Sequence, residues 1–314
     1  MIVTLTLNPS LDRAIDVDKL VRGTVIRADS ARLDPGGKGV NVSRALLANG
    51  VKSRAVVPIG AEEGDQLVRL LTAEGVDMIT VPISGRTRSN ITIAEPDGTV
   101  TKINEPGSPL SEAETEALAD AIRSAAGSAD WVVICGSLPP EAPDDTYARL
   151  CGRLRAAGIQ VAVDTSGPAL LPAILAGPNL IKPNREELAE AVGRPITTLS
   201  DVVGAAVGLR AATDLIVLAS LGADGAVLID GDGVTVGTCP VQEPRSTVGA
   251  GDALLAGFLA GGAHGPAALA EGLAWGAAAV GLPGSRMPRP TDIDRTRVRV
   301  VRNPDLSRSL SSSG

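Results

Sequence analysis

The stretch WVVIC at Trp131–Cys135 precedes a helical pattern at Asp145–Ala156 and a second apolar run, QVAVD, at Gln160–Asp164. Continuous runs rich in β-branched residues predict strands that are covered on both faces. Two such strands joined through a helix form a parallel pair, because a parallel connection needs a long crossover. This stretch therefore predicts an α/β protein built on a mostly parallel sheet.

The alternation of strands and helices continues on both sides of this stretch. Upstream, the patterns predict strands and helices at Ile2–Leu7 (strand), Val42–Asn49 (helix), Arg54–Ile59 (strand), Asp65–Ala73 (helix), Met78–Val81 (strand) and from the capping box Ser111-x-x-Glu114 to about Ala126 (helix). Downstream, they predict elements at Ala169–Leu175 (helix), Asn179–Lys182 (strand), from near Asn184 (helix), Asp201–Ala212 (helix), Leu215–Ala219 (strand) and Ala253–Ala260 (helix).

Two segments, about 13–33 and 89–103, break the alternation. The first alternates polar and apolar residues without a helix signal, and the second predicts a hairpin that turns at Glu95-Pro96-Asp97-Gly98. We expect both to form a small β-sheet lid above the carboxyl ends of the main strands, where α/β proteins bind ligands. Another hairpin, Ala226–Asp230 with Val234–Thr238, predicts an antiparallel edge of the main sheet, and Arg295–Gly314 is typical of a frayed tail.

The composition suits a globular chain and excludes several classes of protein. Of the 314 residues, 44% are hydrophobic and 21% charged, and no long linker divides the chain, so we predict a single domain over 1–314. A net charge of −7 argues against broad binding to nucleic acids or anionic membranes, and an aromatic content of 1% leaves too few rings to stack bases.

The cysteines and the apolar segments indicate a cytoplasmic protein. Cys135, Cys151 and Cys239 are odd in number and have no CxxC spacing, which argues against a disulfide framework and suits a reducing compartment. The Ala/Gly-rich stretch 253–282 contains charged and proline residues, so we expect no membrane span there. The lone His264 is expected to be a surface residue.

The strongest candidate for chemistry is STVGAGDAL at Ser246–Leu254. Two glycines let the backbone approach a ligand, and the helix that follows offers free N–H groups and a positive dipole end to an anion. Asp252 in the first turn could take a proton from a substrate hydroxyl. The alternative is an ordinary helix start with an acidic first turn, and the local pattern favours the two equally.

Two further stretches offer ligands for a phosphorylated substrate. In DPGGKGVNV at Asp34–Val42, Lys38 lies between glycines, in a pattern that is neither a Walker A loop nor a dinucleotide fingerprint. In KPNREEL at Lys182–Leu188, the lysine could face nucleotide phosphates, while Asn184 and Glu187 could orient water around Mg²⁺. The alternatives are a glycine-rich turn for the first stretch and a helix cap for the second.

Together these stretches resemble the ribokinase-like (PfkB) carbohydrate kinases, and the match extends from Asn8 to about Asp292. The Gly36–Asn41 loop, Lys182–Leu188 and Ser246–Asp252 carry the resemblance. Further motifs resemble the hexose-phosphate kinase branch, and within it the 1-phosphofructokinases: Asn8-Pro9-x-x-Asp12, Ile103–Gly107, Gly36-Gly37-Lys38-Gly39 and Leu282–Pro288.

The resemblance implies a ribokinase-like three-layer α/β sandwich with a mostly parallel central sheet and a small β-sheet lid. It implies ATP-dependent phosphorylation of a ketohexose phosphate, fructose 1-phosphate to fructose 1,6-bisphosphate, with Mg²⁺ as cofactor. The lid in this branch often pairs with its twin, so a homodimer is expected, and no nucleic acid or membrane is expected as a partner.

The resemblance also assigns roles to residues. Asp252 would be the catalytic base, with Gly249, Ala250 and Gly251 as the anion hole. The sugar phosphate would be bound by Asp12, Arg27, Gly37, Lys38, Asn41, Arg88, Asn90, Lys102, Ser137 and Asp164. The nucleotide would be bound by Lys182, Asn184, Glu187, Ser220, Gly222 and Thr247, of which Asn184 and Glu187 would also hold Mg²⁺ through water.

Three alternatives to this function stay open. Tagatose 6-phosphate or fructose 6-phosphate could be the acceptor instead, since Arg88 and Lys102 can meet a phosphate at either end of a ketohexose. A sugar-phosphate binder without catalysis would belong to another class of protein. The intact Gly249–Asp252 stretch argues against it, because a binder has no need of a base.

Overall fold

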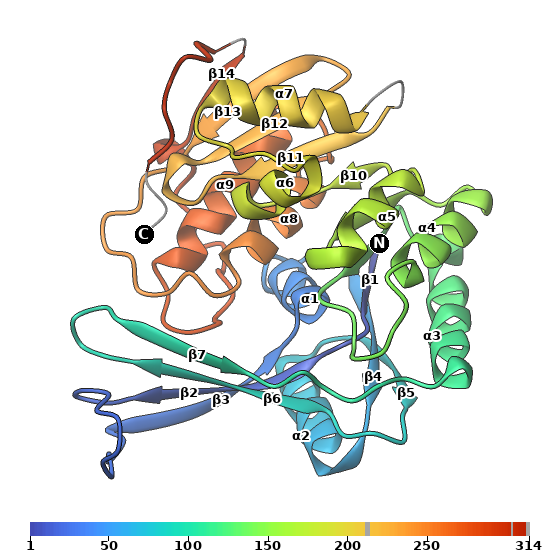
Figure 1. The fold of residues 1–314 in the computed structure, drawn as a ribbon, viewed down its shortest axis with the longest axis vertical. Helices are drawn as coiled ribbons and strands as arrows, with labels where there is room; N and C mark the ends of the chain where they lie inside the picture. Colours follow the sequence, from blue (N-terminus) through green and yellow to red (C-terminus); the bar gives the residue numbers. More distant parts are fainter. Residues whose placement is uncertain (211–213, 303, 312–314) are drawn as a thin grey trace.

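The computed structural model describes residues 1–210, 214–302 and 304–311, and Figure 1 shows their fold. Strands of the large sheet are β1 (Ile2–Thr6), β4 (Ser53–Ile59), β5 (Met78–Pro82), β8 (Trp131–Cys135), β9 (Val161–Asp164), β10 (Leu180–Ile181), β11 (Ile216–Ser220), β12 (Ala226–Asp230), β13 (Gly233–Thr238) and β14 (Arg299–Arg302). Within the described residues their order is β14-β13-β12-β11-β10-β9-β8-β1-β4-β5.

The large sheet is mostly parallel, as predicted from Trp131–Asp164. Neighbouring strands from β5 to β11 in this order are parallel, and β12, β13 and β14 extend the sheet by antiparallel pairs. The central strands are apolar and buried along their length, which suits a sheet covered on both faces.

Helices cover both faces and make three layers. They are α1 (Lys38–Ala48), α2 (Ala61–Glu74), α3 (Glu112–Ala125), α4 (Thr146–Ala156), α5 (Leu170–Leu175), α6 (Arg185–Val192), α7 (Leu199–Arg210), α8 (Ala250–Ala260) and α9 (Gly265–Val280). Helices α3 to α7 contribute to one apolar cluster, and α1, α8 and α9 contribute to another on the opposite face. Within the described ranges, the helices are too short or too polar to cross a lipid bilayer.

The predicted lid is a separate four-stranded sheet that extends away from the helical layers in Figure 1. Its strands are β2 (Ser10–Asp16), β3 (Ser30–Gly36), β6 (Arg88–Ala94) and β7 (Val100–Asn104), in the order β3-β2-β6-β7. Strands β6 and β7 form the predicted hairpin. The other pair starts earlier than the sequence pattern indicated, so Asp12 lies on a lid strand.

Two helices differ from the prediction. The first, α1, begins at Lys38 rather than Val42, because Gly37 adopts a φ of 112° and turns the chain directly into the helix. The second, α9, follows α8 within the Ala/Gly-rich stretch and was not predicted. Its small residues allow close packing: a Cβ at Gly272 would lie 2.7 Å from the carbonyl oxygen of Leu254. The predicted end of the helix Asp201–Ala212 lies outside the described residues.

The frayed tail predicted for Arg295–Gly314 is wrong over 295–302 and 304–311, while 303 and 312–314 lie outside the described residues. Residues Arg299–Arg302 form β14, which pairs with β13 and takes the edge position expected for the Ala226–Thr238 hairpin. Further on, Leu310 is buried and its N–H donates to the carbonyl of Thr197. The arginines and serines give this segment a polar composition, but backbone pairing and one buried leucine hold it on the domain.

Candidate active site

Three parallel strands end side by side and place polar groups at one edge of the large sheet. Asp164 ends β9, Lys182 follows β10, and Ser220 ends β11. Registered pairing aligns β9 with β10 and β10 with β11, and Asn184 forms a bridge with Ser220. The edge is formed by strand carboxyl ends, where ligands bind in this fold class.

The N-terminus of α8 meets the same edge. Gly249 adopts the left-handed conformation, with a φ of 77°, and the helix begins at the next residue. The first N–H groups of a helix have no partner within it, so those of Gly251 and Asp252 are available to an anion, while that of Ala250 donates to the carbonyl of Thr247 at 3.4 Å. The Lys182 ammonium is close, since a Cβ at Gly251 would lie 3.3 Å from its nitrogen.

Asp252 lies in the first turn of α8 and is 7% exposed. Its Oδ2 accepts a hydrogen bond of 2.9 Å from Nδ2 of Asn41 on α1. Burial, and after it the charge of Asp164, raise the pKa of Asp252 to about 6 against the opposing effects of Asn41, Lys182 and Lys38. A carboxylate with a pKa near 6 is ionised at neutral pH and is well matched to accept a proton there.

Asp164 is held between two lysines. Lys38 Nζ lies 2.8 Å from its Oδ1, and Lys182 Nζ lies 3.0 Å from its Oδ2. Burial opposes ionisation of Asp164, but the two ammonium groups outweigh it and hold its pKa below the ordinary value. Lys38 also lies 3.4 Å from Glu187, and although burial opposes it, these carboxylates raise the Lys38 pKa. Lys38 is therefore charged at neutral pH.

The lid contributes a second polar cluster around Asp12. Its Oδ1 accepts hydrogen bonds from Ser10 (2.7 Å) and Asn90 (2.9 Å). A Cβ at Gly36 would lie 2.3 Å from Oδ2 of Asp12, so no other residue fits there without displacing this carboxylate.

Two buried polar atoms of β6 have no hydrogen-bond partner within the described residues: Arg88 Nε and Asn90 Oδ1. Arg88 donates through Nη1 to the carbonyl of Glu105, and burial lowers its pKa despite the opposing charge of Asp12. A buried donor without a partner costs about 1–3 kcal/mol, so such atoms mark a place for a ligand.

The predicted nucleotide residues fall into two groups. Asn184 and Glu187 form the reciprocal capping box of α6, with both hydrogen bonds at 2.8 Å. The helix cap that the sequence offered as the alternative for this stretch is therefore present. Ser220 ends β11, Gly222 lies in the turn that follows it, and Thr247 is exposed just before α8. Among the described residues, none of the three forms a hydrogen bond with the side chain of Asp252.

Other predicted residues lie apart from the Asp252 cluster. Arg27 is exposed in the loop between β2 and β3, and Lys102 is exposed on β7; in the described ranges, neither forms a hydrogen bond or ion pair with the cluster. Ser137 follows β8, and its carbonyl accepts a long hydrogen bond of 3.5 Å from the buried Tyr147 hydroxyl. Only the backbone of Ser137 is engaged in this way.

The sequence did not single out Arg44, which lies one turn beyond Asn41. Its Nη1 donates to Asn41 Oδ1 at 3.3 Å, and the guanidinium forms a bidentate ion pair with Glu74. The signal that could have identified it is a charged residue three positions after Asn41, on the same face of a helix that otherwise faces the core.

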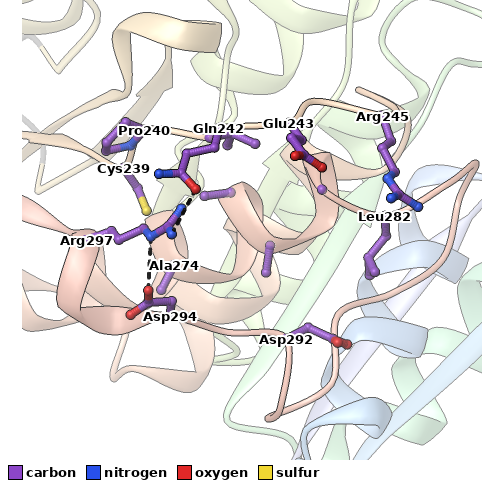
Figure 2. Close-up of a pocket in the computed structure, with 14 residues that line it drawn as sticks. Cys239, Pro240, Gln242, Glu243, Arg245, Ala274, Leu282, Asp292, Asp294 and Arg297 are labelled. Atoms are coloured by element: carbon purple, nitrogen blue, oxygen red, sulfur yellow. Dashed lines mark hydrogen bonds and ion pairs between the residues drawn. The ribbon is translucent and has the colours of Figure 1, made fainter.

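Figure 2 shows a pocket of about 460 Å³ whose lining contains none of the residues of the Asp252 cluster. Its lining comes from residues 239–245, from α9 and from 292–297. Arg245 donates its N–H to the carbonyl of Val280, and Ser246 follows it on the approach to α8. Across the mouth, Arg297 is bonded to Gln242 and Asp294.

The residues at the site do not form a metal cage. Among the described residues, no three His, Cys, Asp or Glu side chains gather as a set of metal ligands. Both oxygens of Glu187 already have partners, in Asn184 and Lys38. The donors fit a hydrated ion that is carried by the phosphates of a nucleotide, since Mg²⁺ retains several waters.

Comparison with known proteins agrees with this geometry. The model of the pfkB family carbohydrate kinases matches residues 5–292. A 1-phosphofructokinase of Rhodobacter capsulatus is 38% identical over 82% of both chains, and one of Haloferax volcanii is 37% identical over 96% of this chain and 98% of that one. The crystal structure of phosphofructokinase-2 from Escherichia coli in complex with substrates and products superposes with a TM-score of 0.88, at 34% identity, over 93% of this chain and 96% of that one.

Proposed function

The chain belongs to the pfkB family of carbohydrate kinases, and we propose that it transfers the γ-phosphoryl group of ATP to fructose 1-phosphate. The products are fructose 1,6-bisphosphate and ADP. The observation that carries the proposal is the buried carboxylate of Asp252 at the N-terminus of α8, beside two buried or half-buried lysines.

Asp252 acts as the general base. As the acceptor hydroxyl attacks phosphorus, its proton passes to Oδ1 or Oδ2 of Asp252, and the bond between the γ-phosphorus and the bridging oxygen of ATP breaks. A pKa near 6 keeps this carboxylate ionised before the reaction and still basic enough to accept the proton.

The α8 N-terminus and Lys182 stabilise the transferred group. Phosphoryl transfer spreads negative charge over the transferred oxygens, so positioning and positive charge supply most of the catalysis. The free N–H groups in the first turn of α8, those of Gly251 and Asp252, and the ammonium of Lys182 lie together at this point. Asp164 holds Lys182 and Lys38 in place as an ion-paired unit.

The acceptor lies against the lid. Asp12 accepts hydrogen bonds from Ser10 and Asn90 and has capacity to accept a sugar hydroxyl. The unpartnered Arg88 Nε and Asn90 Oδ1 provide a donor for the substrate phosphate and an acceptor for a hydroxyl. Lys38 follows the lid strand β3 and pairs with Asp164 of the large sheet, so it connects the lid to the carboxyl edge of that sheet. Arg27 and Lys102 would contribute to binding of the substrate phosphate only from the rim of the lid.

ATP binds along the carboxyl edge toward β11. Ser220, Gly222 and Thr247 line the way from the α8 N-terminus, and the pocket of Figure 2 has room for the adenosine end. Mg²⁺ would be carried by the phosphates of ATP, and Asn184 and Glu187 at the cap of α6 would hold it through water. The ion would neutralise part of the negative charge of those phosphates.

A ketohexose phosphate is favoured over a plain sugar by the cations on the acceptor side, Lys38 and Arg88. Fructose 1-phosphate is favoured because several relatives that cover most of the chain are 1-phosphofructokinases. Fructose 6-phosphate is the second candidate, because phosphofructokinase-2 of Escherichia coli has the same fold at 34% identity. Tagatose 6-phosphate is a third, and a binder without catalysis would not need Asp252.

A coupled assay of ADP release ranks these candidates. Fructose 1-phosphate, fructose 6-phosphate and tagatose 6-phosphate are measured in parallel, and kcat/KM is compared because this ratio defines specificity. We expect fructose 1-phosphate to exceed the others by about tenfold or more, which corresponds to one well-placed contact of about 1.4 kcal/mol. A higher value for another acceptor would move the assignment to that sugar, and no ADP release with any would favour the binder.

We further propose a homodimer through the lids, in the cytoplasm. Val100 and Ile103 lie on β7, an edge strand of the four-stranded sheet, and are exposed by 47% and 54%. A small sheet with apolar residues on an open face gains from a partner. The free thiols of Cys135, Cys151 and Cys239 suit a reducing compartment.

A further inference from the structure

Arg44 is linked to Asp252, the proposed base, through the side chain of Asn41. It is three residues after Asn41 on α1, and only 5% of its side chain is exposed. Its Nη1 donates to Asn41 Oδ1 at 3.3 Å, and Asn41 Nδ2 donates to Asp252 Oδ2 at 2.9 Å. The three groups therefore form a continuous chain from guanidinium to amide to carboxylate.

The chemistry of the three groups allows only one direction of hydrogen-bond donation, from Arg44 through Asn41 to Asp252. A guanidinium can only donate hydrogen bonds, and an ionised carboxylate can only accept them. The amide of Asn41 has one end of each kind, so it satisfies both neighbours only with its oxygen toward Arg44. Without the guanidinium, the amide could turn over and present its oxygen to Asp252, where two acceptors would repel each other.

Arg44 itself is rigidly held. Its Nε and Nη2 each donate to Glu74 at 2.7 Å, and Nη1 also donates to the carbonyls of Pro35 (3.2 Å) and Ser285 (3.1 Å). A bidentate pair fixes the plane of the guanidinium, so the contact with Asn41 comes from a fixed direction. These partners belong to α2, to the lid strand β3 and to the loop after α9.

We propose that Arg44 is a positioning residue for phosphoryl transfer: it fixes the amide of Asn41 and, through it, the carboxylate of Asp252. This inference rests on the proposed function, because it takes Asp252 as the base. The competing role is a purely structural brace that ties α2, the lid and the loop together.

Kinetics of Arg44→Met separate the two roles. Methionine fills a similar length without donating, and the exposed position of Glu74 lets water replace its lost partner. We expect kcat to fall about tenfold or more, the range for one hydrogen bond to a charged group, with both KM values within about threefold. Arg44→Lys retains one donor and should recover part of the loss.

Glu74→Gln is the matched control. It weakens the ion pair but leaves the contact between Arg44 and Asn41, so it should lower the melting temperature while kcat stays near that of the wild type. If Arg44→Met and Glu74→Gln lower kcat alike, Arg44 is a brace and the proposal is overturned.

A double-mutant cycle with Asn41→Ala tests the route. If Arg44 acts through Asn41, Arg44→Met should change kcat by less than about twofold in the Asn41→Ala background. An equal fold loss in both backgrounds would overturn the proposal. If Arg44→Met does not fold, Arg44→Lys completes the same cycle.

A titration of the unliganded protein makes the test independent of activity. Asp252 is faced by Asp164 from β9, Lys38 and Asn41 from α1, Lys182 after β10 and Cys135 from β8. Loss of the Asn41 donor removes a group that lowers the Asp252 pKa. The carboxyl ¹³C signal of Asp252, assigned by its absence in Asp252→Asn, should titrate near pH 6 in the wild type and at higher pH in Arg44→Met.

An unchanged midpoint would overturn the positioning role, whether or not the protein phosphorylates fructose 1-phosphate. A shifted midpoint in a protein without sugar-phosphate kinase activity would instead leave the contact chain intact and refute the proposed function.

Discussion

At the scale of single residues, Asp252 is the group on which the account depends. A carboxylate that is 7% exposed loses hydration, and within the part of the chain that the structure describes only Asn41 donates a side-chain hydrogen bond to it. Buried charges are tolerated where function requires them, because the same desolvation that destabilises the ion makes it a better base.

Asp252→Asn should lower kcat by about 10²–10⁴, the usual loss when a general base is removed. The wild-type activity should decline as the pH falls through about 6, since protonated Asp252 cannot accept the proton. Steady-state kinetics from pH 5 to 8 check both statements. A variant with kcat near that of the wild type would remove Asp252 from the mechanism.

The same shift predicts the stability of this variant. The Asp252 pKa is about 6 in the folded protein and 3.8 without the protein environment, so ionisation costs stability that increases from about pH 4 and is complete above pH 6. Two pKa units correspond to about 3 kcal/mol. The melting temperature of Asp252→Asn at pH 7.5 should therefore be no lower than that of the wild type, which also shows that lost activity is not lost folding.

Some of the site could be predicted from single residues and some could not. The glycines, Lys38, Lys182 and Asp252 have local signals, because backbone approach and helix termini depend on neighbours in the chain. Arg44 has only its spacing of three residues from Asn41 as a local signal, because its other partners, Glu74 and Ser285, are brought to it by the fold.

At the scale of elements, the start of β6 gives different surroundings to two arginines that lie two positions apart in the chain. The side chain of Arg88, the first residue of β6, is half-buried near Asp12, whereas that of Arg86, two residues before the strand, is 55% exposed and pairs with Glu63 and Glu105. We expect only Arg88 to contact the substrate.

Arg88→Ala should raise the KM for the sugar phosphate by about ten- to a hundredfold, the effect of one charged hydrogen bond, and change the KM for ATP little. Arg86→Ala should leave both values near those of the wild type. Kinetics with a melting curve on each sample check this pair. Should both KM values of Arg88→Ala rise together with a lower melting temperature, Arg88 only braces the lid.

Prediction of elements succeeded where the signals were local. The capping box Ser111–Glu114 begins α3 as expected, and the buried strands lie within a residue or two of their predicted bounds. It failed at α9, where small residues obscure the helical period, and at the C-terminal segment, where long-range pairing decides the structure.

Leu310→Ala tests the role of that segment. The side chain packs in the large apolar cluster, and truncating a buried leucine costs about 2–5 kcal/mol. The free energy of unfolding in urea should fall by this amount with unchanged KM values. Leu175→Ala is the control, since Leu175 is 78% exposed. Equal, small effects of the two substitutions would mean that the tail does not contribute to the domain.

At the scale of the whole molecule, the lid is the small sheet that extends away from the large sheet and its helices (Figure 1). Light scattering at micromolar concentration should give about twice the chain mass of 31.8 kDa. Ile103→Asp, which places a charge on the exposed face of β7, should shift the mass toward the monomer. A wild-type mass of one chain would refute pairing through the lids.

The central claim is that this site transfers the γ-phosphoryl group of ATP to a second position of a ketohexose phosphate. ³¹P NMR of a reaction with ATP, Mg²⁺ and fructose 1-phosphate tests it most directly, with Asp252→Asn as the control. We predict that the γ-phosphate signal of ATP is replaced by a second phosphate monoester on the sugar, in equal amount to ADP, with the wild type and not with the variant. Release of inorganic phosphate without a second monoester, or the same spectrum from both proteins, would contradict the account.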